Sequence, residues 1–142
     1  MTPMTPINPT VNTGIDIANR YCYFFDDAEF LEEGRAGFRR RVVLGEQLEL
    51  WFWRIDDGAG GSVLHHHPGN EQIGIIIRGA LDFRIGDPAD DTRVVLREGD
   101  VYLAGMNVWQ GDSRFIGDEE LGEVWILDVF APPRSTAPGQ TT

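Results

Sequence analysis

Residues 65–72 read His65-His66-His67-Pro68-Gly69-Asn70-Glu71-Gln72, and Gly79 follows seven residues later. This stretch contains all three histidines of the chain. In an extended strand, His65 and His67 leave the same face, because side chains alternate with a period of two. Glu71 or Gln72 follows closely enough to reach the same point. Two imidazoles and a carbonyl or carboxylate oxygen can bind a divalent metal ion, so the stretch predicts half of a metal site.

On both sides of this stretch, short runs of β-type residues alternate with turn signals such as Asp57-Gly58 and Glu98-Gly99-Asp100. Many short strands at this spacing favour an all-β sandwich or barrel over an α/β fold. One helical turn is expected over 27–31. The predicted strands are 38–44, 48–55, 62–67, 72–78, 81–85, 93–96, 101–103 and 124–130.

The composition of the 142 residues indicates a folded, acidic domain. Apolar residues make up 42% of the chain and the net charge is −11. This charge argues against nucleic acid or an anionic membrane as a partner. Cys22 is the only cysteine, which excludes an internal disulfide and fits a reducing compartment. With no signal peptide and no apolar run of about 20 residues, we expect a cytoplasmic protein.

The expected organisation is one domain. Residues 1–37 are expected to form an N-terminal arm and the strand that leads into the domain, residues 38–134 the domain itself, and residues 135–142 a flexible tail. We expect a homodimer formed through the N-terminal strand.

The histidine stretch resembles the first motif of the cupin superfamily, small double-stranded β-barrels built from two histidine-containing motifs. That motif reads G, five residues, H-x-H, three or four residues, E, six residues, G. Counting back six residues from Gly79 lands on Gln72, so a glutamine would hold the third ligand position. The string EQIG at 71–74 is similar to that of small cupins related to polyketide cyclases.

The second cupin motif reads G, five residues, P-x-G, two residues, H, three residues, N. Starting at Gly99, its glycine position is Asn107, which tolerates a left-handed turn conformation. Gln110 occupies the histidine position of this motif, so the fourth histidine of the cupin pattern is missing. Three interpretations of Gln110 remain. It could be a weak fourth ligand of the metal, or it could lie beside the ligands and leave one coordination position to water or substrate. It could also indicate that the site has lost its metal. Asp112 could supply a carboxylate on the same face.

The end of the chain resembles the D-x-F-x-P-x-R ending of cupins that linearise unsaturated uronic acids. Asp128, Phe130 and Arg134 match its three named positions, and the resemblance implies that they act in catalysis or substrate binding. Alternation along the last strand predicts that Asp128 shares a face with Ile126 and Phe130. A buried Asp128 beside a metal is a candidate general base, and Arg134 could clamp an anionic oxygen. The alternatives are an Asp128 that only hydrogen-bonds a loop and an Arg134 on the surface.

Aromatic residues are numerous for a chain of this length. Trp51 and Trp53 share one strand face, and together with Tyr102 they either line a ligand cavity or fill the core. If they line the cavity, an aromatic or apolar substrate is favoured over a bare sugar. Gly74 stands where the uronate-linearising group carries a polar side chain, which leaves room for a bulkier ligand. The arginines at 39–41 are expected at a solvated strand end, with one of them able to point into a barrel.

The fold expected from this resemblance is all-β, a double-stranded β-helix of the cupin type, jelly-roll-like. The leading hypothesis for function is a metal-dependent lyase, isomerase or cyclase acting on a small carbonyl or enol compound, polyketide-like or sugar-acid-like. A divalent ion (Zn, Mn, Fe or Ni) held by His65, His67, Gln72 and Gln110 would act as a Lewis acid, and Asp128 would move a proton. One alternative is a non-enzymatic cupin that binds a small molecule. Another is a cupin dioxygenase.

Overall fold

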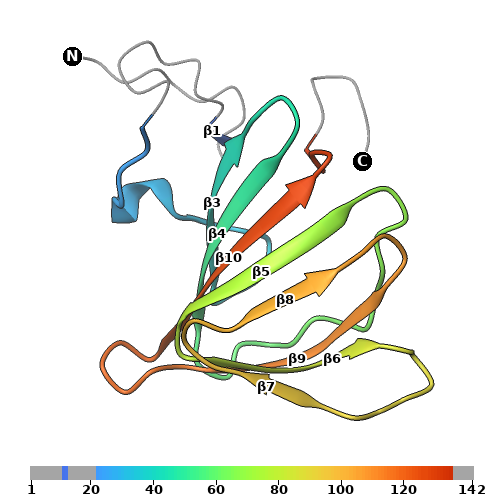
Figure 1. Ribbon diagram of the computed structural model, residues 1–142. Helices are drawn as coiled ribbons and strands as arrows, with labels where there is room; N and C mark the ends of the chain where they lie inside the picture. Colours follow the sequence, from blue (N-terminus) through green and yellow to red (C-terminus); the bar gives the residue numbers. More distant parts are fainter. Residues whose placement is uncertain (1–10, 13–21, 136–142) are drawn as a thin grey trace.

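The computed structural model describes residues 11–12 and 22–135, and this part of the chain is almost entirely β-structure (Figure 1). Its one helix is a short 3-10 turn, η1 (Asp27–Glu29), capped by the side chain of Asp26. None of the described residues forms a helix long and apolar enough to cross a membrane. The strands are β1 (Val11–Asn12), β2 (Leu31–Glu32), β3 (Phe38–Leu44), β4 (Glu49–Asp56), β5 (Glu71–Arg78), β6 (Ala80–Gly86), β7 (Val94–Leu96), β8 (Val101–Ala104), β9 (Trp109–Ile116) and β10 (Glu123–Ala131).

The strands form two sheets. One has the order β1-β3-β4-β10-β5-β8, with β2 beside β3, and the other has the order β7-β6-β9. The last strand, β10, lies between β4 and β5 in the middle of the larger sheet (Figure 1). The core fills the space between the sheets with residues from both, among them Phe38, Ile76, Phe83 and Phe115. The all-β prediction is therefore confirmed. Most of the predicted arm (1–10 and 13–21) and tail (136–142) lies outside the described residues.

Two differences from the predicted strands lie next to each other. The predicted strand 62–67 is wrong, because only His65 forms a β-bridge there, through two backbone hydrogen bonds of 2.8 Å with Gln110. Its partner, β9, was not predicted. Gly111 and Asp112 both have positive φ, and the pairing with β6 shifts register beside them, as in a β-bulge. A bulge interrupts the alternation by which strands are recognised, which explains the omission.

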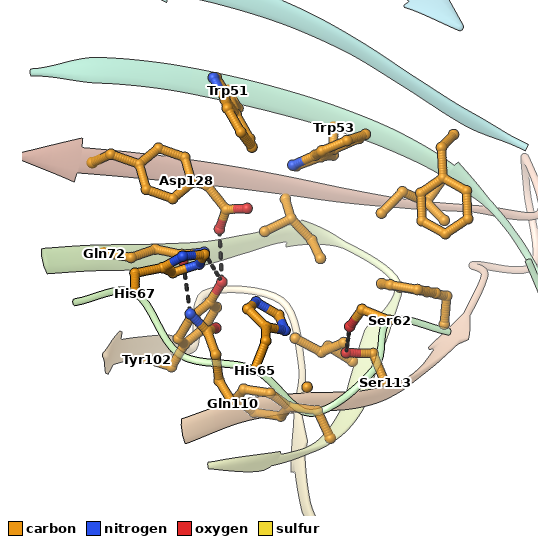
Figure 2. Close-up of a pocket in the computed structure, with 18 of the residues that line it drawn as sticks. Trp51, Trp53, Ser62, His65, His67, Gln72, Tyr102, Gln110, Ser113 and Asp128 are labelled. Atoms are coloured by element: carbon orange, nitrogen blue, oxygen red, sulfur yellow. Dashed lines mark hydrogen bonds between the residues drawn. The ribbon is translucent and has the colours of Figure 1, made fainter. Parts of the chain in front are cut away.

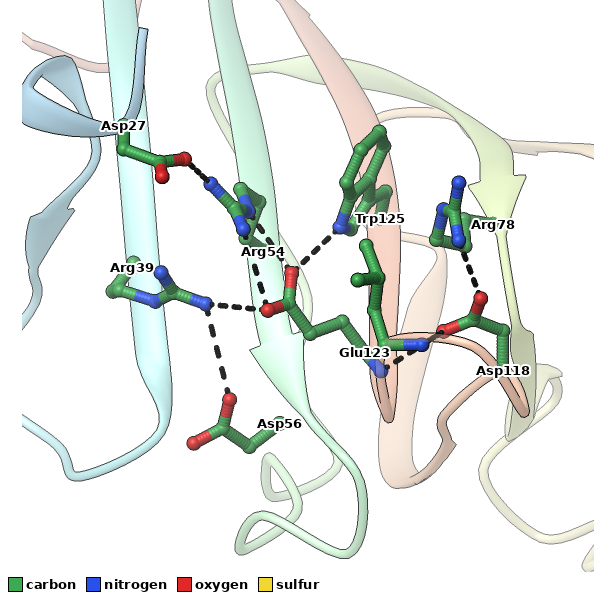
Figure 3. A network of polar contacts seen from close by, with 9 residues as sticks. Asp27, Arg39, Arg54, Asp56, Arg78, Asp118, Glu123 and Trp125 are labelled. Carbon is green, nitrogen blue, oxygen red and sulfur yellow. Dashed lines mark hydrogen bonds and ion pairs between the residues drawn. The ribbon is translucent and has the colours of Figure 1, made fainter.

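A network of polar contacts ties η1 to the outer face of the larger sheet (Figure 3). Glu123 accepts hydrogen bonds from Arg54 at 2.9 Å, from Arg39 at 3.0 Å and from the indole of Trp125 at 2.8 Å. Arg54 also pairs with Asp27 of η1. Burial opposes ionisation of Glu123, but these hydrogen bonds outweigh it and hold its pKa below the ordinary value. The network therefore fixes the segment before β3 on one end of this face.

The three arginines at 39–41 divide between the two faces of β3. Arg39 belongs to the network above, and Arg41 is buried, with its guanidinium donating to the carbonyl of Phe24. Arg40 points inward and lies 4.1 Å from the ring centroid of Trp51. The expectation of a solvated strand end is thus wrong for Arg41, while one of the three does point into the barrel.

Candidate functional site

A cavity of about 200 Å³ lies between the two sheets. The predicted site residues come from four strands of the larger sheet, from β9, from the loop before β5 and from the segment after β10. The structure brings all of them to this one cavity. They are Trp51, Trp53, His65, His67, Gln72, Tyr102, Gln110, Asp128, Phe130 and Arg134.

The rings of His65 and His67 lie close together, although these residues do not belong to a regular strand. Their ring centroids are 4.9 Å apart. The Nδ1 atom of His65 lies 2.7 Å from the carbonyl oxygen of Val63. In a neutral ring this contact requires the proton on Nδ1, which leaves the lone pair on Nε2. His66 stacks instead on Trp109, with ring centroids 4.3 Å apart, and does not line the cavity.

His67 is held in its neutral form. Burial lowers its pKa to about 4, and the positive charge of Arg134 acts in the same direction. Its Nε2 atom is buried and has no hydrogen-bond partner. A neutral imidazole with an unpartnered buried nitrogen is in the state needed to bind a cation.

Four buried side chains form a hydrogen-bonded chain across the cavity wall (Figure 2). The amide of Gln110 donates to Gln72 Oε1 at 2.7 Å, and the amide of Gln72 donates to the hydroxyl oxygen of Tyr102 at 2.7 Å. The Tyr102 hydroxyl then donates to Asp128 Oδ1 at 2.8 Å. The carboxylate can only accept, so it sets the direction of the whole chain and the orientation of both amides.

Asp128 is a buried carboxylate at the end of this hydrogen-bonded chain. Burial raises its pKa to about 6, against the opposing effect of the hydrogen bonds from Tyr102, Gln72 and Trp53. Burial and the neighbouring carboxylate raise the pKa of Tyr102 well above its ordinary value. Asp128 therefore changes protonation state near neutral pH while Tyr102 keeps its proton.

Tyr102 reaches Asp128 because its partner on β5 is a glycine. Gly74 and Tyr102 are directly paired between β5 and β8. A Cβ atom at Gly74 would lie only 2.0 Å from Cε2 of the Tyr102 ring. The expectation that Gly74 leaves room for a bulkier ligand is therefore wrong, because the tyrosine ring already fills that space.

Arg134 lines the cavity rather than standing free on the surface. Its guanidinium lies 5.1 Å from the ring centroid of Trp51 and 5.3 Å from that of Phe130. Its backbone N–H donates to the buried carboxylate of Glu49 at 2.8 Å, which fixes the chain after β10. Burial lowers the pKa of Arg134 below its ordinary value, yet a guanidinium remains charged at neutral pH.

The other end of the cavity contains residues that the sequence did not single out. Ser62 and Ser113 lie there with their hydroxyl oxygens 3.0 Å apart, away from Asp128 (Figure 2). Arg35 lines the same cavity, with its guanidinium 3.8 Å from the ring centroid of Phe38. The remaining wall is apolar and consists of Phe38, Ile55, Leu81, Phe83, Phe115 and Ile126. Only Ile126 had a sequence signal, through its alternation with Asp128.

The structure tests two predictions made for the segment that contains the second motif. Asn107 has φ 67°, so the expected left-handed turn is confirmed. The suggestion that Asp112 supplies a carboxylate is wrong, because it is exposed and pairs with Arg93 at 2.9 Å outside the cavity.

The donor atoms fit a divalent ion held by imidazole and amide groups. Among residues 22–135, no cluster of three or more His, Cys, Asp or Glu side chains could hold a metal. The imidazoles of His65 and His67 can act as donors, and the unpartnered Nε2 of His67 supports this role. Gln72 Oε1 already accepts one hydrogen bond and has one lone pair left. Such a donor set would bind more weakly than one with three histidines.

Comparisons with known proteins agree on one fold. A family model described as "Cupin domain" matches residues 51–126. Comparison with curated proteins gives no match. The structure of KdgF from Halomonas sp. is similar to this chain, with a TM-score of 0.65 and 22% identity over 80% of this chain and 96% of the other. An RmlC-like cupin from Shewanella frigidimarina has a TM-score of 0.62 and 20% identity, over 80% of this chain and 93% of the other.

An oxalate decarboxylase variant from Bacillus subtilis is also similar, with a TM-score of 0.62 and 18% identity. It covers 79% of this chain, which spans only 30% of that larger protein. Similarity at these identities establishes the fold alone, and it confirms the predicted double-stranded β-helix.

Proposed function

Because the chain belongs to the cupin family, we propose that its cavity binds a small anionic carbonyl compound with an apolar part and catalyses proton transfer at the carbon beside the carbonyl. Isomerases, lyases and cyclases share this enolisation step. The observation that carries the proposal is Asp128, a buried carboxylate with a pKa of about 6 that lines a cavity shared with neutral His67 and cationic Arg134.

The two ends of the cavity support the proposed substrate class. Arg134 offers a planar cationic fork beside the Trp51 and Phe130 rings, which suits a carboxylate or enolate oxygen next to a flat group. The opposite end offers mainly apolar side chains, and its polar groups are the hydroxyls of Ser62 and Ser113, which share one hydrogen bond, and the guanidinium of Arg35. A bare sugar acid would leave most of its hydroxyl groups without partners there, so an aromatic or otherwise apolar group is favoured.

The proposed step uses the chain's own groups. The ionised Asp128 takes the proton from the substrate carbon, the C–H electron pair forms the carbon–carbon double bond, and the carbonyl π pair moves onto oxygen. Arg134 stabilises the negative charge that develops there. Tyr102 donates to the carboxylate and Gln72 donates to the Tyr102 hydroxyl, so Tyr102 holds the carboxylate directly and Gln72 holds Tyr102. A divalent ion held by His65, His67, Gln72 and Gln110 would supply Lewis-acid polarisation of the carbonyl oxygen.

Phenylpyruvate is a suitable probe because it combines a carboxylate, an enolisable carbonyl and an aromatic ring. We expect the protein to accelerate deuterium incorporation at its benzylic carbon in D₂O, followed by NMR, with saturable binding seen as quenching of tryptophan fluorescence. Binding without exchange would instead support the non-enzymatic binding cupin. Oxygen consumption by the metal-loaded protein would support the dioxygenase. The absence of binding, exchange and oxygen uptake would remove the proposal for this substrate class.

Replacement of His65 and His67 tests whether the cavity binds a metal ion. Protein purified without chelators is expected to contain about one equivalent of a divalent metal by elemental mass spectrometry, and the His65→Ala/His67→Ala variant almost none, because both imidazole donors are lost. His66→Ala is the matched control, since His66 stacks on Trp109 outside the cavity. Equal metal content in the double variant and the wild type would rule out this site. A wild type that stays metal-free after reconstitution would do the same.

A further inference from the structure

An irregularity in β9 turns a serine into the cavity. Residues three apart on a regular strand point to opposite faces, yet Gln110 and Ser113 both line the cavity. Gly111 and Arg114 pair with residues that are only two apart on β6, so β9 carries one extra residue between them. This bulge changes the alternation and directs Ser113 inward. Bulges often redirect a side chain in this way beside a functional site.

The loop before β5 holds a second serine against this bulge (Figure 2). The backbone N–H of Ser113 donates to the carbonyl of Ser62 at 3.4 Å, and their hydroxyl oxygens lie 3.0 Å apart. The loop lies so close to β9 that a Cβ atom at Gly61 would be 2.0 Å from the Ser113 carbonyl oxygen. A Cβ atom at Gly111 would be 2.2 Å from the Val63 carbonyl oxygen. The two glycines therefore allow the approach that fixes both hydroxyl groups.

The serine pair, Ser62 and Ser113, keeps hydrogen-bonding capacity for a ligand. Two hydroxyl groups offer two protons and four lone pairs, and the contact between them uses one of each. Among residues 22–135, neither hydroxyl forms another hydrogen bond. The wall around the pair is apolar, with the rings of Phe38 and Phe115 5.4 Å apart between centroids. One donor and three acceptor positions therefore remain in an apolar region.

A phenol group matches these positions better than the alternatives. Its hydroxyl donates one hydrogen bond and accepts another, so it can use the free proton and one lone pair of the serine pair. An unsubstituted ring would cover the pair and leave these positions without a partner. A ring carboxylate has no proton to donate and would lie against apolar side chains. Arg35 would help it little, because this residue is exposed and its charge is screened by water.

The serine pair lies within reach of the proposed reaction centre. Ser113 follows Gln110 by three residues, a path of at most about 10 Å along β9. Gln110 begins the hydrogen-bonded chain that ends at Asp128. One six-membered ring joined to a keto acid spans a distance of this order. We propose that the serine pair selects a phenol ring, so that the substrate is an aryl keto acid with a hydroxyl group at the far end of its ring. The keto acid half of this inference rests on the proposed function.

Isothermal titration calorimetry of two keto acids tests this selection. The wild type is expected to bind 4-hydroxyphenylpyruvate about tenfold more tightly than phenylpyruvate, the effect of one or two hydrogen bonds. The Ser62→Ala/Ser113→Ala variant should bind both compounds equally. Thr92→Val is the matched control and should keep the preference, because it removes a hydroxyl from the loop between β6 and β7, outside the cavity. A preference that survives in the double serine variant would overturn the inference.

A second pair of probes, p-cresol and toluene, differs by the same hydroxyl group but lacks the keto acid. In NMR titrations, the wild type is expected to bind p-cresol about tenfold more tightly than toluene, and the double serine variant should bind both equally. This preference without exchange of either keto acid would support the serine site and remove the proposed function. Exchange of phenylpyruvate by a wild type that binds p-cresol no more tightly than toluene would remove the serine site alone.

Discussion

Asp128→Asn is expected to slow the exchange of phenylpyruvate by about a hundred to ten thousand fold, the usual contribution of a general base. The amide of asparagine is nearly isosteric and can still accept the Tyr102 hydrogen bond, so the cavity keeps its shape. Phenylpyruvate should still bind, because the change removes a negative charge from a site that faces an anion. In the wild type, the rate should rise with pH through about 6 as Asp128 ionises.

Asp112→Asn is the matched control for this loss of rate. Asp112 is exposed and pairs with Arg93 outside the cavity, so the same chemical change there should leave exchange unaltered. A fully active Asp128→Asn variant, or a wild-type rate that falls as pH rises through 6, would exclude Asp128 as the base.

The same substitution should stabilise the fold at alkaline pH. The folded pKa of about 6 lies above the ordinary value of 3.8, so the folded state loses stability as pH rises between these values and keeps that loss above them. The gap corresponds to about 3 kcal/mol. The free energy of unfolding of the metal-free protein, measured in urea, should therefore be higher for Asp128→Asn than for the wild type by up to about that amount near pH 8. The difference should vanish near pH 3. A carboxylate kept at a cost in stability is typical of functional sites.

The sequence motifs were sufficient to locate the cavity. Counting back from Gly79 selected Gln72 over Glu71, and the structure buries Gln72 in the cavity wall while Glu71 is exposed. Alternation along the last strand placed Asp128, Ile126 and Phe130 on one buried face, as the structure has them. These predictions succeeded because a strand's period of two follows directly from backbone geometry.

The contacts inside the cavity could not be predicted in the same way. The contact of Tyr102 with Gly74 depends on the register between β5 and β8, and a shift of one residue would turn Tyr102 to the outer face. Ser113 lies in β9, where the bulge hides the strand pattern. The hydrogen-bonded pairing of Gln72 with Gln110 depends on the fold bringing β5 near β9. The sequence therefore predicted most of the strands, although not β9, and the tertiary pairing decided which side chains meet.

Gly74→Ala is expected to destabilise the protein by about 3 kcal/mol, because its methyl group would overlap the buried Tyr102 ring, which already packs against Phe83 at 5.1 Å between centroids. Relief of the overlap requires displacement of Tyr102, so the variant should also lose much of its exchange activity as Asp128 loses its hydrogen bond. Urea unfolding measures the first effect and the phenylpyruvate assay measures the second.

A double-mutant cycle separates this overlap from a general intolerance of alanine in β5. In a Tyr102→Ala background the ring is absent, so adding Gly74→Ala should cost far less, with a coupling energy of about 2 kcal/mol or more. Gly69→Ala is the control, since no atom lies within 4 Å of a Cβ there, and its effect should stay within about 0.5 kcal/mol. Equal costs of Gly74→Ala in both backgrounds would mean that the tyrosine ring does not occupy this space. The link from Gly74 through Tyr102 to Asp128 would then be lost, because nothing else pairs the carboxylate with β8.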